Sequence, residues 1–245
     1  MELSYPFDPE ERAAESERLV LKEGKRLYHR FRPAPYYGGI ATADAIGCCF
    51  LCAYCWNYNR NLNPQRFDNF YSAQEVSSRL LKIARKRFFH QFRITGSEPV
   101  LGENSFNHLL KVITHIFQEM PQSIFILETN GFVLGYRKDF IKKLKYPNLR
   151  IRISLKGTDE DSFQNISGAK KEYFLYPFVA LKELRAQGIK AWPAVMKDLF
   201  TEDEIERLRR FLHEYRIKSE LELEYLERYP FVLENMDKRN IQIKE

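Results

Sequence analysis

All four cysteines of the chain, Cys48, Cys49, Cys52 and Cys55, lie within eight consecutive residues. Clustered thiols in a reducing compartment bind metals or do redox chemistry more often than they form disulfides. Cys48, Cys52 and Cys55 follow the spacing C-x3-C-x2-C. Three thiolates in one loop can bind three irons of a [4Fe–4S] cluster and leave the fourth iron open, as a catalytic site requires. The spacing therefore predicts an iron–sulfur cluster with an open coordination position.

The remaining thiol, Cys49, directly follows Cys48. Its sulfur would have difficulty turning towards the same cluster, so we expect Cys49 to be a small buried residue. The alternative is a structural zinc ion held by all four thiols. Zinc sites usually combine two separated pairs of ligands, and no histidine lies near this loop in the sequence, so the cluster is favoured.

The composition is that of a globular protein. Hydrophobic residues make up 44% of the 245 residues, enough for a core. No apolar run reaches the roughly 18 residues that cross a bilayer, and the N-terminus has neither the basic nor the apolar region of a signal peptide. We therefore expect a cytoplasmic protein that does not enter a membrane. A formal net charge of +6 permits contact with nucleic acid but does not require it.

Strand-like apolar runs alternate with helix-length amphipathic segments, a pattern typical of a parallel α/β sheet. The expected strands are 38–47, 91–96, 123–131, 149–157, 190–197 and 220–227. The expected helices are 8–24, 72–89, 105–119, 136–145, segments within 159–187, and 201–215. Six β/α units fall short of a full (β/α)8 barrel, so we expect a partial (β/α)6 barrel.

We expect three regions along the chain. Residues 1–38 would form an N-terminal helix and a basic, aromatic lead-in, which Pro33 and Pro35 keep from being helical. Residues 39–199 would form the barrel core, and residues 200–245 a C-terminal helix and strand that complete it.

Polar and glycine residues gather where four of these strands end. They are Gly47, Thr95-Gly96-Ser97-Glu98-Pro99, Glu128-Thr129-Asn130-Gly131 and Ser154-Leu155-Lys156-Gly157. Functional groups of such folds lie at the carboxyl ends of the strands, so these four ends and the cysteine loop predict one site.

With these motifs the chain resembles the radical S-adenosylmethionine (SAM) superfamily over about residues 39–199. C-x3-C-x2-C with the aromatic Tyr54 before the last cysteine follows the first core strand, and GSEP at 96–99 is similar to the family's GGEP motif. The Tyr54-Cys55-Trp56-Asn57 run, LETNG at 127–131 and SLKGTD at 154–159 resemble the activases of glycyl-radical enzymes. Two residues depart from these motifs. Ser97 stands at the second glycine of GGEP, and Ser154 stands at the aspartate of the activases' D-x-K segment.

The resemblance implies a mechanism and its cofactors. Cys48, Cys52 and Cys55 would bind a [4Fe–4S] cluster whose open iron is chelated by SAM. An electron from an external flavodoxin or ferredoxin would cleave SAM to a 5′-deoxyadenosyl radical, which takes a hydrogen atom from the substrate. The protein would orient these groups and exclude water.

The resemblance also assigns roles to strand-end residues. Gly96, Ser97 and Glu98 would fix the SAM amino group. Lys156 would bind the SAM carboxylate, with Ser154 near the ribose. The remaining cofactor-binding residues would be Tyr54, Asn57, Asn130, Val195 and Met196, with Tyr54, Asn57 and the backbone near Val195 and Met196 flanking the adenine.

The sequence leaves the substrate open. It could be a glycine of a partner protein, a small molecule in cofactor biosynthesis, or RNA, for which the basic and aromatic residues of 25–37 argue. We favour a structural role for 25–37, and nucleic acid is therefore not the favoured partner. The chain has no cysteine for a second cluster. A non-catalytic iron–sulfur protein for electron transfer is an alternative of another class, but it would give the strand-end groups no role.

Overall fold

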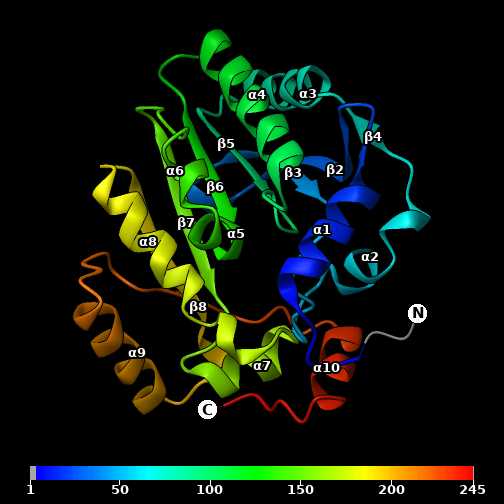
Figure 1. The fold of residues 1–245 in the computed structure, drawn as a ribbon. Coiled ribbons are helices and arrows are strands. Elements are labelled where there is room, and N and C mark those ends of the chain that lie inside the picture. Colours follow the sequence, from blue (N-terminus) through cyan, green and yellow to red (C-terminus); the bar gives the residue numbers. More distant parts are fainter. Residues whose placement is uncertain (1–3, 245) are drawn as a thin grey trace.

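A computed structural model describes residues 4–244 and shows one twisted, open sheet with helices on its outer face (Figure 1). Six strands run parallel and in sequence order: β3 (Ile40–Ala45), β5 (Gln91–Thr95), β6 (Ile124–Thr129), β7 (Leu149–Leu155), β8 (Lys190–Met196) and β9 (Glu222–Glu224). Within the described residues, β9 pairs only with β8, so the sheet does not close. This is the predicted partial barrel of six β/α units.

Most of the helices that join these strands are close to the predicted ones. The joining helices are α3 (Ala73–Arg87), α4 (Glu103–Glu119), α5 (Phe132–Tyr136), α6 (Lys138–Ile141), α7 (Glu160–Ser167), α8 (Tyr176–Ala186) and α9 (Glu202–Glu214), with 3-10 turns η3 (Lys171–Tyr173) and η4 (Lys197–Leu199). The two short helices α5 and α6 replace the single helix predicted over 136–145. Capping boxes fix two of their starts: Ser72 with Glu75 begins α3, and Thr201 with Glu204 begins α9. None of the helices described is long and apolar enough to span a membrane.

The N-terminal region differs from the prediction of one helix over 8–24. The helix α1 (Pro9–Val20) ends earlier, and β1 (Leu21–Lys22) turns back into β2 (Lys25–Ala34). Glu23 and Gly24 both have positive φ, as a two-residue hairpin turn requires. The basic, aromatic lead-in is thus a strand, β2, which adds antiparallel to β3.

Several short elements were not predicted. After the cysteine loop come α2 (Tyr58–Leu62), η2 (Pro64–Arg66) and β4 (Phe70–Tyr71), and η1 (Tyr36–Gly38) precedes β3. The last strand is shorter than the predicted 220–227, and α10 (Pro230–Asp237) follows it. The segment of α10 returns to the carboxyl end of the barrel, where Arg239 donates to Ile166 O at the end of α7 (3.1 Å) (Figure 1).

The two faces of the sheet have opposite character, because side chains alternate along each strand. On β7, Leu149, Ile151, Ile153 and Leu155 are buried against the helices. Between them, Arg152 and Ser154 point into the barrel, where they contact carboxylates of β9. The outer face thus carries the hydrophobic core and the inner face carries the polar groups.

Buried His108 on α4 gives a prediction for stability. Burial, together with the charge of Arg26 on β2, lowers its pKa to about 4. The unfolded chain takes up this proton near pH 6.5, so stability is present above that pH and falls as the pH drops towards 4. We expect urea unfolding of His108→Gln to lose less stability between pH 7 and pH 5 than the wild type, by up to about 1.4 kcal/mol per pH unit. Exposed His213→Gln is the control, and equal slopes in the wild type and His108→Gln would contradict this account.

Candidate active site

The cysteine loop lies at the carboxyl end of β3, between α1 and α7. Gly47 begins the loop with φ +97°, and a Cβ there would lie 2.7 Å from Val20 of α1. Ser16 of α1 donates to Cys48 O (3.2 Å). On the other side, Leu51 N donates to Ser167 O and Ala53 N to Ile166 O, both at 2.9 Å. Helices from distant parts of the chain therefore hold the loop at both ends.

The thiols lie in a buried setting with amide donors beside them. Burial is the main cause that raises the pKa of Cys52 to about 11 and of Cys55 to about 12. Asn61 Nδ2 lies 3.9 Å from Cys55 Sγ, and Asn130 Nδ2 lies 3.9 Å from Cys48 Sγ. Such donors stabilise thiolates bound to iron.

Cys48 and Cys49 have different surroundings. The sulfur of Cys49 is buried and accepts from Asn130 Nδ2 at 3.2 Å. Burial raises the pKa of Cys49 well above its usual value, whereas the hydrogen bond from Cys49 lowers the pKa of Cys48. The hydrogen bond between the two thiols favours the thiolate form at Cys48, and the assignment of Cys48, Cys52 and Cys55 to the cluster stays a prediction.

The GSEP segment meets the cysteine loop through Asn57. This buried amide donates to Gly96 O (2.9 Å), Ser97 Oγ (2.8 Å) and Ala45 O (3.2 Å). Gly96 has φ +86°, where a side chain would be strained and its Cβ would lie 3.2 Å from that of Asp44. Ser97 is not among the residues with positive φ, so a serine fits the family's second glycine position without strain. Asn57 thereby joins the ends of β3 and β5.

The role of Glu98 in fixing the SAM amino group stays a prediction, but the structure shows what its side chain contacts. Its carboxylate is buried and accepts from Thr129 Oγ1 (2.7 Å), Asn130 N (2.8 Å) and Val100 N (3.0 Å). Burial raises the pKa of Glu98 to about 6. The side chain connects the ends of β5 and β6, so only the backbone of this segment is left for a cofactor.

Glu98→Gln should therefore destabilise the fold itself. The glutamine NH₂ group would face the N–H of Asn130, leaving two buried donors without an acceptor, at a cost of about 2–3 kcal/mol. Urea unfolding without SAM measures this change, with exposed Glu103→Gln as the control. If Glu98→Gln left the stability unchanged but weakened SAM binding, the side chain of Glu98 would have to be assigned to SAM binding.

Lys156 lies at the end of β7 and faces the cysteine loop. Its Nζ donates to Ser154 Oγ (2.6 Å) and to Tyr54 Oη (3.0 Å). Burial disfavours the ammonium charge, but Tyr54, Cys52 and Glu224 outweigh it and raise the pKa of Lys156. The structure thus brings Tyr54, Ser154 and Lys156 together.

The strand-end residues Val195 and Met196 end β8, where they pair with Leu223 and Glu224 of β9. Both are buried. Their backbone therefore lies at the same edge of the sheet as Lys156, since Val195 also pairs with Leu155 of β7.

The sequence analysis missed a set of ion pairs on the inner face of the barrel. Asp44 accepts from Arg30 (2.5 Å) and Arg32 (2.8 Å), and Arg93 pairs with Glu128 (2.7 Å). Arg152 pairs with Glu222 (3.0 Å) and Glu224 (2.9 Å), and Trp192 Nε1 donates to Glu222 (2.5 Å). The alternation of charged and apolar residues in RIRISLK and ELELE is the signal that could have found them.

Two further residues near the thiols were missed. Asn61 Oδ1 accepts from Gly47 N (3.0 Å) and Ser97 Oγ (2.7 Å), and so ties both ends of the site. Buried Arg12 of α1 donates to Asn61 O (2.8 Å). Burial lowers the pKa of Arg12, although the nearby thiols of Cys48 and Cys49 favour its charge. Nothing in the sequence spacing marks either residue.

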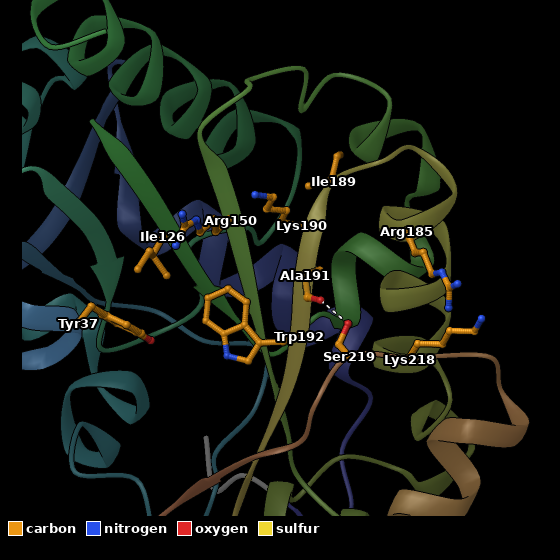
Figure 2. A pocket seen from close by; sticks show the side chains of 10 residues that line it. All are labelled: Tyr37, Ile126, Arg150, Arg185, Ile189, Lys190, Ala191, Trp192, Lys218 and Ser219. Carbon is orange, nitrogen blue, oxygen red and sulfur yellow. Dashed lines mark hydrogen bonds between the residues drawn. The ribbon is translucent and has the colours of Figure 1, made fainter. Parts of the chain in front are cut away.

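A cavity of about 710 Å³ lies away from the cysteine loop, at the amino ends of β7 and β8. Figure 2 shows Trp192 and Tyr37 on one side of β8 and Arg185, Lys218 and Ser219 on the other. We call it the basal cavity. Reactive groups of such barrels lie at the opposite, carboxyl end of the strands, and the cysteine loop lies there too. The basal cavity is therefore not the catalytic site.

Comparison with known proteins agrees with this geometry. The sequence model of the "Radical SAM superfamily" matches residues 45–212, more than half of the chain. The chain is 31% identical over 122 residues to a probable GTP 3′,8-cyclase of Saccharolobus solfataricus, a match covering 49% of this chain and 35% of that protein. It is 28% identical over 121 residues to the GTP 3′,8-cyclase of Microcystis aeruginosa, with the same coverages. These matches span about a third of the length of the curated relatives.

Solved structures share the fold. Streptococcus suis SuiB bound to S-adenosylmethionine has a TM-score of 0.60 and 18% identity, covering 82% of this chain and 41% of SuiB. A spore photoproduct lyase mutant with bound AdoMet and dinucleoside spore photoproduct has a TM-score of 0.64 and 15% identity, covering 86% and 63%.

The chain therefore belongs to the radical SAM superfamily, and its cofactors are SAM and a [4Fe–4S] cluster. The residues of the cysteine loop fit a [4Fe–4S] cluster that binds SAM. Each thiolate of a cubane site binds a different iron, so the thiols stand further apart than the ligands of one ion. Within residues 4–244, no group of three Cys, His, Asp or Glu side chains is arranged to hold a single metal ion.

Proposed function

We propose that this chain is a radical SAM enzyme that removes a hydrogen atom from a small molecule in cofactor biosynthesis. The observation that carries the proposal is the junction at Asn57. Its amide joins the cysteine loop to Gly96 and Ser97, so the thiols and the SAM-binding strand end form one rigid site.

The proposal gives each residue a task. Cys48, Cys52 and Cys55 would hold the cluster, which, when bound, supplies the electron that cleaves SAM to methionine and a 5′-deoxyadenosyl radical. The backbone of Gly96 and Ser97 would accept the SAM amino group, as carbonyl oxygens accept from an ammonium.

Other residues would hold the rest of SAM. The ammonium of Lys156 would pair with the SAM carboxylate and Ser154 would contact the ribose. Tyr54 and the backbone of Val195 and Met196 would enclose the adenine. Asn57 and Asn130 would position the loop through their amides. An external flavodoxin or ferredoxin would supply the electron.

A small-molecule substrate fits better than a partner protein's glycine. The curated relatives are GTP 3′,8-cyclases, which by their name act on a nucleotide. The activase alternative depends on short segments only, and its aspartate is replaced by Ser154, whose hydroxyl is bonded to Lys156. It remains the second candidate.

The test is anaerobic reconstitution with iron and sulfide, followed by SAM and dithionite and mass spectrometry of 5′-deoxyadenosine. We expect 5′-deoxyadenosine only when SAM and dithionite are both present. A deuterated substrate should then transfer its label into this product. A complete cluster that never cleaves SAM would refute the proposal and favour the electron-transfer alternative.

A further inference from the structure

A second cavity, about 520 Å³, lies directly beside the cysteine loop. It is lined by Trp56, Asn59, Arg60, Asn63, Arg66, Phe67 and Phe231. The first six come from the segment of α2 and η2, and Phe231 comes from α10, which reaches this side of the molecule from the far edge of the sheet (Figure 1). We call it the α2–α10 pocket.

The pocket is positively charged. Its lining includes Arg60 and Arg66 and no carboxylate. Neither arginine forms an ion pair with any residue between 4 and 244, and the buried Nε of Arg60 has no hydrogen-bond partner there. Burial, followed by the charges of Arg60 and Arg30, lowers the pKa of neighbouring His29. Two guanidinium groups in one lining without a carboxylate to neutralise them favour an anionic ligand.

The same pocket offers planar surfaces and amides. Trp56, Phe67 and Phe231 line it, and the guanidinium of Arg60 lies 5.9 Å from the Phe67 ring centroid. Asn59 and Asn63 add donors and acceptors. Aromatic rings that stack, amides that pair with ring edges and arginines for phosphates are the groups that bind nucleotides.

The pocket is connected to the proposed SAM site. Trp56 directly follows Cys55 in the sequence. Arg60 Nη1 donates to Asn57 Oδ1 (3.4 Å), and the other end of this amide holds Gly96 and Ser97. A ligand bound by Arg60 would therefore lie next to the site where the hydrogen atom is removed.

We propose that the α2–α10 pocket binds the phosphates and the planar base of a nucleotide substrate. The inference rests on the proposed function, whose substrate class it names. The volume is that of small-molecule sites, about 300–1,000 Å³, and the concave, aromatic lining suits a small ligand rather than a protein electron donor. The basal cavity is also basic, but it lies at the end of the barrel opposite the cysteine loop.

Calorimetric titration of the anaerobic, reconstituted enzyme with GTP, ATP and inorganic pyrophosphate tests the proposal, with SAM present. We expect GTP or ATP to bind and pyrophosphate to compete with it. Arg66→Gln and Trp56→Ala should each weaken nucleotide binding about 10-fold or more, the loss of one charge-assisted or stacking contact. Arg185→Gln, in the basal cavity, is the matched control and should bind as the wild type does.

Three results of the titrations would overturn the inference: no nucleotide binding up to about 5 mM, a weak interaction by any measure; equal binding by Arg66→Gln and the wild type; or weakened binding in Arg185→Gln. An RNA oligonucleotide that binds while mononucleotides do not would also overturn it, in favour of a nucleic-acid substrate. SAM cleavage by the wild type without nucleotide is measured in parallel. Its absence would refute the proposed function, whereas the titrations judge the pocket independently.

Discussion

Cys52→Ala is expected to abolish 5′-deoxyadenosine formation and to remove most of the bound iron and sulfide. Cys52 is buried in the loop that α1 and α7 hold, and burial raises its pKa to about 11, so without iron its charged form is disfavoured. A cluster held by three thiolates cannot easily replace a lost one. The only further cysteine of the chain is Cys49, which directly follows the proposed ligand Cys48. Activity should fall by at least roughly 100-fold, since the cofactor carries the chemistry.

Cys49→Ala is the matched control for this experiment. It removes a thiol of the same loop that is not assigned to iron. The sulfur of Cys49 instead accepts a hydrogen bond from Asn130. We expect iron and sulfide content, the visible absorption of the cluster and SAM cleavage to stay near the wild-type values. If Cys49→Ala lost the cluster and Cys48→Ala kept it, the two neighbours would have to exchange roles.

The sequence predicted the strand order and most of the site because both follow from local patterns. Period-two alternation marks β5 and β7, and a continuous apolar run marks β6. Capping boxes at Ser72 and Thr201 mark the starts of two helices between the strands. Parallel strands in sequence order bring their carboxyl ends to one edge. The residues at 96–98, 130 and 154–156 therefore had to lie at one edge of the sheet. There, Asn57 contacts Gly96, and Lys156 contacts Tyr54 of the cysteine loop.

Such local patterns could not predict where a side chain points or where distant segments of the chain lie. Glu98 lies in a motif at the site, yet its carboxylate points to Thr129 and Asn130, which only the packing of β5 against β6 decides. The hairpin at Glu23 and Gly24 depends on positive φ at a glutamate, which propensity disfavours. The return of α10 to the cysteine loop is a tertiary contact between residues more than 150 positions apart, so no local signal records that Phe231 lies near Trp56.

Lys156→Met is expected to weaken SAM binding strongly while leaving the cluster in place. Burial disfavours the charge of this ammonium, but nearby groups, Glu224 among them, raise the pKa of Lys156 overall. The ammonium donates hydrogen bonds to the hydroxyls of Ser154 and Tyr54, and no carboxylate among the described residues lies at salt-bridge distance. A charge-assisted bond to the SAM carboxylate would complete its surroundings. Its loss should raise the Kd for SAM about 30-fold, or about 2 kcal/mol.

Equilibrium dialysis of the reconstituted protein with labelled SAM measures this Kd, and iron analysis of the same samples checks the cluster. Lys170→Met, at a half-buried lysine paired with Asp8, is the control and should bind SAM as the wild type does. Lys156→Arg should bind SAM with intermediate affinity, since it keeps the charge but not the compact ammonium. Loss of iron in Lys156→Met would contradict the SAM role. The ammonium would then serve to balance the charge of the thiolates, since Lys156 and Cys52 already affect each other's pKa.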